Sequence, residues 1–259
     1  MIRGLVPVAL ALFATMTPAR AASERLLLTL SSDRVVIASN YAGADITLFG
    51  AVRPEGAAAA RPGPYDLIVT TRGPLETLTV REKGRVAGLW LNRDSRSFLH
   101  APSYLSVLSN RPLEAVADAS LRAREELGLA ETLAAPGRGS AEMPAAEAAR
   151  FAAALRRLQT ARALWREDPE GVSFLDPALF RATLRLPPDT PLGDYQVEAR
   201  LFSAGEPIAR ETIAFHVVKA GFEARVAELA ETRRVAYAAA TATLALLFGW
   251  LASVMFRRD

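Results

Sequence analysis

The chain has 259 residues, of which 51% are hydrophobic and 23% charged, with a formal net charge of only +3. This composition supports a folded core, and the interleaved charges argue against the basic surface that a nucleic-acid-binding protein needs. The absence of cysteine excludes disulfides, thiolate metal sites and cysteine nucleophiles, while two histidines, His100 and His216, exclude a histidine-rich metal site. We therefore expect no bound metal or cofactor.

The first 21 residues have the form of a secretory signal peptide. "MIRGLVPVALALFATMTPARA" carries a positive charge at Arg3, an apolar run from Leu5 to Met16 and a small-x-small signal at Ala19-Arg20-Ala21. An uncleaved signal anchor is the alternative, but the apolar run is short for a membrane span. We expect the residues from 22 to about 234 to be exported.

Residues 22–110 have the pattern of a β-sandwich region. Short apolar or alternating runs are separated by turn residues, as in sheets with one buried face. The expected strands lie at 26–30, 35–38, 44–52 and in "YDLIVTT", "LETLTVRE" and "VAGLWLN", with a flexible 53–64 and turns at Arg72-Gly73-Pro74 and Lys83-Gly84.

A helical insertion is expected at 111–167. Apolar residues follow helical spacing from Pro112 to a cap at Gly128, and a loop is expected at 130–143. A second helix opens at Pro144 and stops at 168–171, so the two helices form an antiparallel pair. The apolar face of this second helix consists of Phe151, Leu155, Leu158 and Trp165.

The β pattern resumes at 168–218, and the spacing suggests an immunoglobulin-like sandwich. Alternating apolar residues fill 180–186 and 195–201, and Tyr195 follows Gly193 as in the tyrosine corner of immunoglobulin-like domains. Val197 occupies the position where those domains often carry a cysteine. This block either completes the first sandwich or forms a second small one.

The closing segment predicts a membrane anchor. An amphipathic stalk helix at 219–234 leads into 22 uncharged residues, 235–256, which as a helix of about 33 Å match the hydrocarbon core of a bilayer. Residues 257–259 then form a cytoplasmic tail. Small residues lie along one face of this helix and favour a membrane-protein partner or a homo-oligomer, although alanine bias alone can produce such a stripe. They are Ala238, Ala242, Ala245, Gly249 and Ala252.

The best catalytic candidate is a polar stretch, "NRDSRSFLHAPSY" (92–104), with Asp94, Ser95, Ser97, His100, Ser103 and Tyr104. A Ser-His-Asp site is possible on composition, but triads are assembled from separate elements, so an ordinary polar strand or loop is the better interpretation.

For the other residues that could take part in catalysis or binding, a structural role is the better interpretation. His216 alternates with apolar neighbours, and the pairs Glu125-Glu126 and Glu167-Asp168 suit solvated helix ends better than acid–base catalysis. Trp90 suits the sandwich core better than a binding platform.

The chain resembles the family of putative transmembrane proteins of Alphaproteobacteria that have about this length. The matching segments are "SSDRVVIASNYAGADITLFGAV", "RGPLETLTVREKGRVAGLWLN", "APSYLSVLSNRPL" and "LWREDPEGVSFLDPALFRATLRLPPDTPLGDYQVEARLF", together with the terminal helix. The resemblance implies no established activity or catalytic residues. It also implies a transporter accessory role, because the family often occurs beside a sulfite-exporter-like permease.

Taken together, the sequence predicts a single-pass periplasmic interaction module in the bacterial inner membrane that performs no catalysis. A ligand-binding or sensory ectodomain is the alternative, and an exported hydrolase that uses His100 is a third hypothesis. The identity of any ligand or partner lies beyond the sequence.

Overall fold

The computed structural model describes residues 23–55, 64–86, 88–135, 145–220 and 234–255. The predicted signal peptide, nearly all of the stalk and the cytoplasmic tail lie outside these residues. Within them the chain is mainly β, with a helical insertion, as the sequence predicts.

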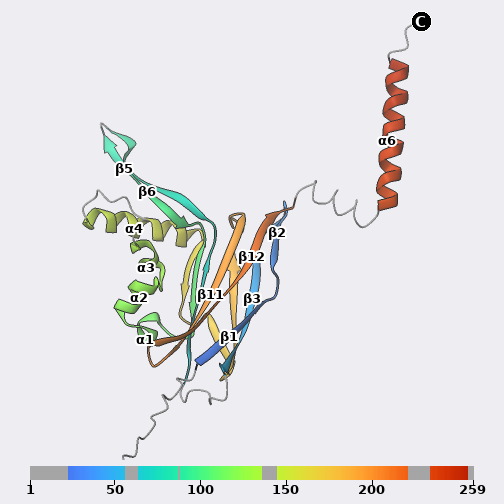
Figure 1. Ribbon diagram of the computed structural model, residues 1–259. Coiled ribbons are helices and arrows are strands. Elements are labelled where there is room, and N and C mark those ends of the chain that lie inside the picture. Colours follow the sequence, from blue (N-terminus) through green and yellow to red (C-terminus); the bar gives the residue numbers. More distant parts are fainter. Residues whose placement is uncertain (1–22, 56–63, 87, 136–144, 221–233, 256–259) are drawn as a thin grey trace, which may run out of the picture.

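Two of the three sheets combine strands from distant parts of the chain (Figure 1). A four-stranded antiparallel sheet has the order β1-β3-β10-β9, and a six-stranded sheet has the order β2-β12-β11-β4-β7-β8. Their strands are β1 (Ser23–Leu30), β2 (Arg34–Ile37), β3 (Ala44–Glu55), β4 (Asp66–Arg72), β7 (Leu105–Ser109), β8 (Trp165–Asp168), β9 (Val172–Asp176), β10 (Leu179–Leu186), β11 (Gly193–Ser203) and β12 (Glu206–Lys219).

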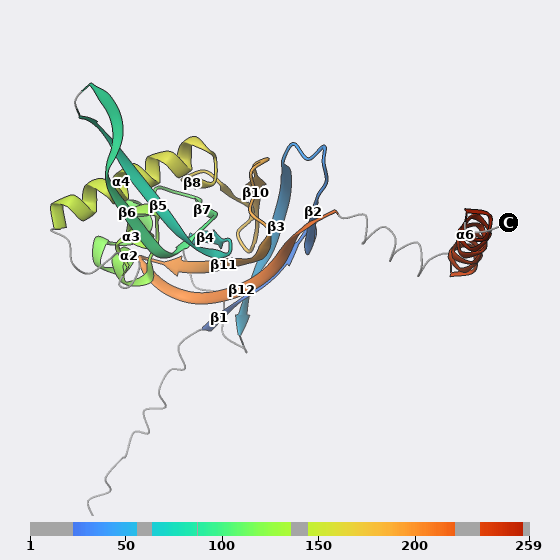
Figure 2. The ribbon, with the colours of Figure 1, turned by 90° about the horizontal axis from the view of Figure 1, so that it is seen from above.

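This pairing answers the question whether the two predicted β regions are separate. β10 pairs with β3 in the four-stranded sheet, and β12 and β11 lie between β2 and β4 in the six-stranded sheet, so each of these sheets combines strands from before residue 110 and after residue 168. The two sheets adjoin where β1 lies beside β12, and together they curl around a common core (Figure 2). The β structure is therefore one composite unit.

The predicted alternation of apolar and polar residues in the late strands is confirmed. Along β10, Phe180, Ala182, Leu184 and Leu186 are buried, while Arg181 and Arg185 are exposed. One face of each strand therefore packs in the core, as period-2 patterning requires.

Gly50 of β3 makes room for an aromatic side chain. It is paired with Phe180, and a Cβ atom placed on Gly50 would lie 2.1 Å from that ring. Phe180 also packs edge-on against Phe174 of β9, with ring centroids 5.9 Å apart.

The predicted tyrosine corner is present at the start of β11. The Tyr195 hydroxyl donates a hydrogen bond of 2.8 Å to the carbonyl of Pro191. Gly193 has a φ of +135°, a conformation that favours glycine, and this explains why a glycine lies two positions before the tyrosine. The Tyr195 ring stacks on Phe215 with ring centroids 4.8 Å apart and contacts Tyr104 at 5.6 Å.

The helical insertion differs from the predicted antiparallel pair, because its first part is broken into three short helices. Asp118 accepts a hydrogen bond from the backbone N–H of Leu121 and so starts a new helix, and Glu126 ends that helix with a φ of +53°. A third short helix occupies part of the expected loop at 130–143. The helices are α1 (Leu113–Val116), α2 (Ala119–Glu125), α3 (Leu129–Ala134) and α4 (Ala145–Ala161).

The predicted helix after residue 144 exists as α4, but Trp165 does not belong to it. α4 ends at Ala161, and Trp165 begins β8, which pairs in parallel with β7. The Trp165 side chain is fully buried, and its Nε1 donates a hydrogen bond of 3.0 Å to the carbonyl of Pro102. Helical spacing alone therefore assigned a strand residue to a helix. Leu158 is also outside the buried face, since it is exposed.

A long hairpin, β5 (Leu75–Val86) and β6 (Leu89–Pro102), forms the third sheet and projects from the rest of the structure (Figure 1). Of the turn predicted before β5 at 72–74, Gly73 and Pro74 separate β4 from β5, but Arg72 still belongs to β4. The turn predicted at Lys83-Gly84 is wrong, because both residues pair with β6. The hairpin is consequently longer than predicted.

The closing segment forms helix α6 (Arg234–Met255). Among the described residues, no helix combines the length and apolar character that crossing a membrane requires. The side chains of Leu244, Leu246, Phe248 and Trp250 are exposed.

We expect Gly50→Ala to destabilise the fold by about 1–3 kcal/mol, because the new methyl group overlaps the Phe180 ring in a packed core. Urea unfolding of the full chain in mild detergent, followed by tryptophan fluorescence, measures the effect. Gly84→Ala is the matched control, since its methyl group meets only the flexible Arg93 side chain. Equal midpoints for the two variants would show that Phe180 does not constrain Gly50.

Candidate functional site

The residues of the polar stretch 92–104 do not assemble into a catalytic triad. Most of them lie along β6, where successive side chains point to opposite faces. The Ser97 hydroxyl lies 3.0 Å from that of Thr79, and the Tyr104 hydroxyl donates a hydrogen bond of 2.9 Å to the carbonyl of Arg185. His100 is exposed and has a φ of +50°.

Two other residues of this stretch have buried environments. Burial raises the pKa of Tyr104 to about 12, so its hydroxyl stays protonated at neutral pH. Ser103 is buried beside it, and its hydroxyl has no hydrogen-bond partner among the described residues. This stretch is therefore a polar strand followed by a loop, which is the interpretation that the sequence favours. The prediction that the protein is not an enzyme stays a prediction.

The remaining titratable candidates hold structural contacts. His216 is exposed on β12, and its Nδ1 lies 2.7 Å from Asp194 on the neighbouring strand. Glu167 and Asp168 are not at a helix end as predicted but in β8. The Glu167 carboxylate accepts a hydrogen bond of 3.2 Å from the backbone N–H of Leu129, at the start of α3.

Glu125 and Glu126, which do lie at a helix end, belong to a network of charges that joins α2 to three strands. Arg200 of β11 donates to both oxygens of Glu198, at 3.0 and 2.9 Å, and to the Glu125 carbonyl at 2.6 Å. Arg210 of β12 lies 2.8 Å from the Glu125 carboxylate, and Arg72 of β4 lies 3.1 Å from that of Glu198. This network anchors the C-terminal end of α2, where positive charge is favourable.

Trp90 contradicts its predicted place in the core. Its side chain is 69% exposed, and it lies near the end of the β5–β6 hairpin. The neighbouring Leu89 and Leu91 are also exposed. The alternative interpretation of Trp90, a surface for binding, is the one that fits this position.

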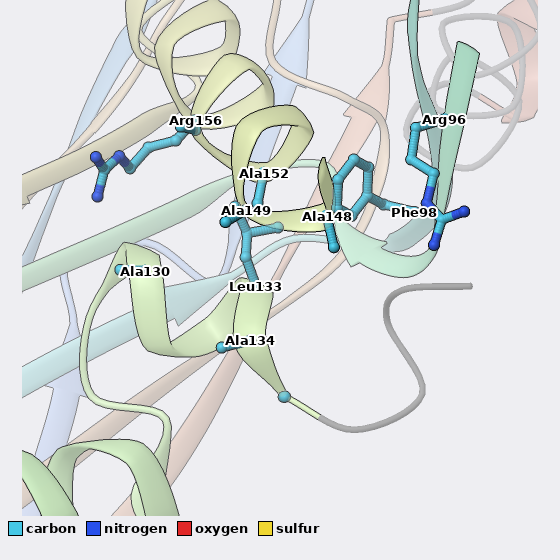
Figure 3. Close-up of a pocket in the computed structure, with 11 residues that line it drawn as sticks. Arg96, Phe98, Ala130, Leu133, Ala134, Ala148, Ala149, Ala152 and Arg156 are labelled. Carbon is cyan, nitrogen blue, oxygen red and sulfur yellow. The ribbon is translucent and has the colours of Figure 1, made fainter. Parts of the chain in front are cut away.

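A concave apolar surface lies between α3, α4 and β6 (Figure 3), and we call it the α3–α4 groove. Its volume is about 500 Å³, within the range of ordinary ligand sites. Phe98 and Leu133 supply its larger side chains, and α4 contributes only small ones apart from an arginine. The lining residues from α4 are Ala148, Ala149, Ala152, Ala153 and Arg156.

The arrangement of α4 follows from its sequence. Phe151 and Leu155, four residues apart, are buried and fix the helix to the core. The alanines of the adjacent helical face then border the groove, so that no large side chain from this face fills it. Arg156 and Arg96 lie on opposite sides of this lining (Figure 3), and of the two only Arg156 is exposed.

Sequence reasoning missed the groove, although its alanine-rich signal is visible in "AEAARFAAALRR". No group of three or more His, Asp or Glu side chains suitable for a metal ion occurs within the described residues. The site therefore offers shape, apolar contact and two arginine side chains.

The comparison with protein families gives one match, to the family described as "Putative transmembrane protein (Alph_Pro_TM)", and the match covers residues 25–258. The chain belongs to this family. The family resemblance predicted from the sequence is thus confirmed, and the match includes both the β structure and α6.

No curated protein sequence matches the chain. Among solved structures, it is similar to the sporulation control protein Spo0M of Bacillus subtilis, with 13% identity and a TM-score of 0.28. The alignment covers 81% of this chain and 55% of the Spo0M chain, so this protein spans about half the length of that structure. The similarity is too low to carry over a fold or a function.

We expect Glu198→Gln to destabilise the protein at neutral pH by about 2 kcal/mol, because it removes the charged partner of Arg200, Arg72 and Arg210. Burial raises the pKa of Glu198, but hydrogen bonding to Arg200 and the nearby positive charges outweigh it and hold the pKa below its usual 4.5. The stabilisation is therefore fully present above pH 4.5 and is lost as the pH falls through the lower, folded-state value.

Urea unfolding of both proteins between pH 7 and pH 3 checks this expectation. The stability difference should shrink towards acid, and the exposed Glu206→Gln serves as the control with no difference at any pH. A difference for Glu198→Gln that is as large at pH 3 as at pH 7 would mean that the carboxylate charge does not cause it.

Proposed function

We propose that this member of the family is a single-pass periplasmic interaction module, which α6 anchors in the inner membrane and whose exported domain binds a partner protein. The observation that carries the binding role is the α3–α4 groove, an open apolar surface with arginines on opposite sides (Figure 3). The anchor rests on the sequence and on the family description rather than on the fold.

The groove has the properties of a surface that receives a helix. Its α4 residues extend from Ala148 to Arg156, about 12 Å along the helix axis, or roughly two turns. Small side chains let a second helix approach closely, and apolar grooves bind amphipathic helices through residues at helical spacing. The exposed positive side chain of Arg156 favours a helix that carries Asp or Glu beside its apolar face. The proposed occupant is therefore an acidic amphipathic helix of an envelope or transporter protein.

The proposed anchor is the uncharged sequence from Val235 to Phe256, followed by Arg257 and Arg258 on the cytoplasmic side. Ala238, Ala242, Ala245, Gly249 and Ala252 are its proposed packing face. Gly249 has open space around it in the single chain, since an added Cβ would meet no atom within 4 Å. A second helix can therefore approach this position closely.

A ligand-binding or sensory role is the second candidate, and the volume of the groove favours it. About 500 Å³ suits a small amphiphile with an anionic head group at one of the arginines. Native mass spectrometry of the protein purified in detergent distinguishes the two, because a tightly bound amphiphile would add a constant mass.

The topology can be tested with single cysteines, because the natural chain contains none. We expect Leu175→Cys, an exposed position on β9, to react with a membrane-impermeant maleimide in spheroplasts. Asp259→Cys should react only after the membrane is permeabilised. Reaction of both cysteines in intact spheroplasts, or of neither, would rule out the proposed orientation.

The binding role can be tested by photocrosslinking in living cells from Ala149 in the groove and from Gly249 in α6. We expect both positions to capture the same envelope protein, and Arg156→Glu to reduce capture from Ala149 about tenfold, because the charge reversal at this exposed residue repels an acidic helix. Arg157, on another face of α4, and Leu247 are the control positions. Adducts that are equally strong at the control positions, or that survive the charge reversal, would count against the groove.

A further inference from the structure

The end of the β5–β6 hairpin exposes three apolar side chains in succession. Leu89 is 66% exposed, Trp90 is 69% exposed and Leu91 is 49% exposed. The two strands form a sheet of their own that extends beyond the helices in both views (Figures 1 and 2). Three large apolar side chains exposed at one end of a hairpin, in a position that no other described element covers, mark a surface for interaction.

The same part of the hairpin is positively charged. Between Arg81 and Arg96 the chain carries four arginines and one lysine against two acidic residues, Glu82 and Asp94. Arg150 of α4 lies 2.8 Å from the Glu82 carboxylate and offsets its charge. Basic side chains thus surround the apolar end of the hairpin.

The register of the hairpin places its apolar side chains on both faces. Trp90 pairs with Arg85, whereas Leu89 pairs with Val86 and Leu91 with Gly84. Since successive side chains of a strand point to opposite faces, the tryptophan lies on one face and the two leucines lie on the other. A flat protein surface would cover one face and leave the other in water. A medium that surrounds the tip covers both faces at once.

We propose that this tip, residues 83–86 and 88–93, inserts into the interfacial layer of an anionic lipid bilayer. Trp90, Leu89 and Leu91 enter the boundary between head groups and acyl chains, where amphipathic indole rings are favoured. Lys83, Arg85 and Arg93 extend their apolar stems along the tip and place their charges at the lipid phosphates. The hairpin is then a membrane contact separate from α6, and it does not depend on the groove.

Two membrane contacts would fix the orientation of the exported domain. An anchor helix alone tethers a domain and leaves it free to rotate and tilt. A second contact at the hairpin tip holds one side of the domain against the lipid surface. Because α4 is joined to the hairpin through Arg150 and Glu82 and borders the groove, the hairpin also sets the position of the groove relative to the membrane.

The test uses the full chain with a nitroxide attached to a single cysteine, either Leu89→Cys at the tip or Leu175→Cys on β9 as a matched exposed control. Each labelled protein is reconstituted into vesicles of phosphatidylglycerol and phosphatidylcholine, and into vesicles of phosphatidylcholine alone. Spin-label accessibility to oxygen and to a water-soluble nickel chelate then reports the depth of the label.

We expect the label at position 89 to be protected from the nickel chelate and exposed to oxygen in the anionic vesicles, while the label at 175 stays fully accessible to the chelate. Lys83→Gln/Arg85→Gln/Arg93→Gln should reduce the inserted fraction in anionic vesicles several-fold, and Trp90→Ala should make the inserted label shallower. Insertion that is equal in the two vesicle types would overturn the role of the basic residues.

A label at 89 that stays as accessible to the chelate as the label at 175 would overturn the proposal. The proposal would also be overturned if that label became immobile only when a membrane protein is added, with no change in its depth. This result would assign the tip to a protein partner. The outcome is independent of the anchor, because flotation of the same samples reports whether the chain associates with vesicles at all. If the protein floats with the vesicles but the label at position 89 remains in water, the anchor is supported and the hairpin proposal is rejected. If the protein does not float but the label inserts at high lipid concentration, the hairpin proposal is supported and the anchor is rejected.

Discussion

The fold depends on the burial of Tyr195 between Tyr104 and Phe215. Its ring is fully buried in contact with both rings, and its hydroxyl satisfies the carbonyl of Pro191. These contacts join the turn before β11 to β12 and to the connection between β6 and β7. A residue late in the chain is thereby fixed to one about 90 positions earlier. The loop entropy that this closure costs grows only slowly with its length, so a compact aromatic cluster can offset it.

The position of β11 determines how the two halves of the chain are joined. Because β11 pairs with β4 on one side and β12 on the other, the six-stranded sheet cannot form before both halves of the chain are present. The helical insertion is then held beside β8 and close to the edge of that sheet. Arg200 secures the end of α2 to β11 by donating a hydrogen bond to the Glu125 carbonyl, and the buried face of α4 reaches the same core. The groove is what remains open between the helices and the hairpin.

The sequence predicts features that local physics determines and misses those that depend on distant contacts. The alternation in β10 and the tyrosine corner are short-range patterns, and both are correct. Trp165 is buried, as its place in an apolar stripe predicts, but it lies in a strand rather than a helix, whereas Trp90, expected in the core, is exposed. Spacing cannot distinguish these cases, because an indole ring suits a buried site and an interface equally well. The Asp118 cap was a readable local signal for a helix break, whereas the groove requires knowledge of which helical faces are covered.

The small side chains of α4 and the exposed apolar side chains of the hairpin both leave apolar surface uncovered. Phe151 and Leu155 of α4 pack in the core, and the small alanines beside them leave a hollow rather than a packed layer. Leu89, Trp90 and Leu91 have no such core to enter, because β5 and β6 pair only with each other. Exposed tryptophan and leucine increase the risk of aggregation in a protein that remains in water. The lipid contact proposed for the hairpin tip would cover these side chains and would also match the positive charge of the arginines beside them.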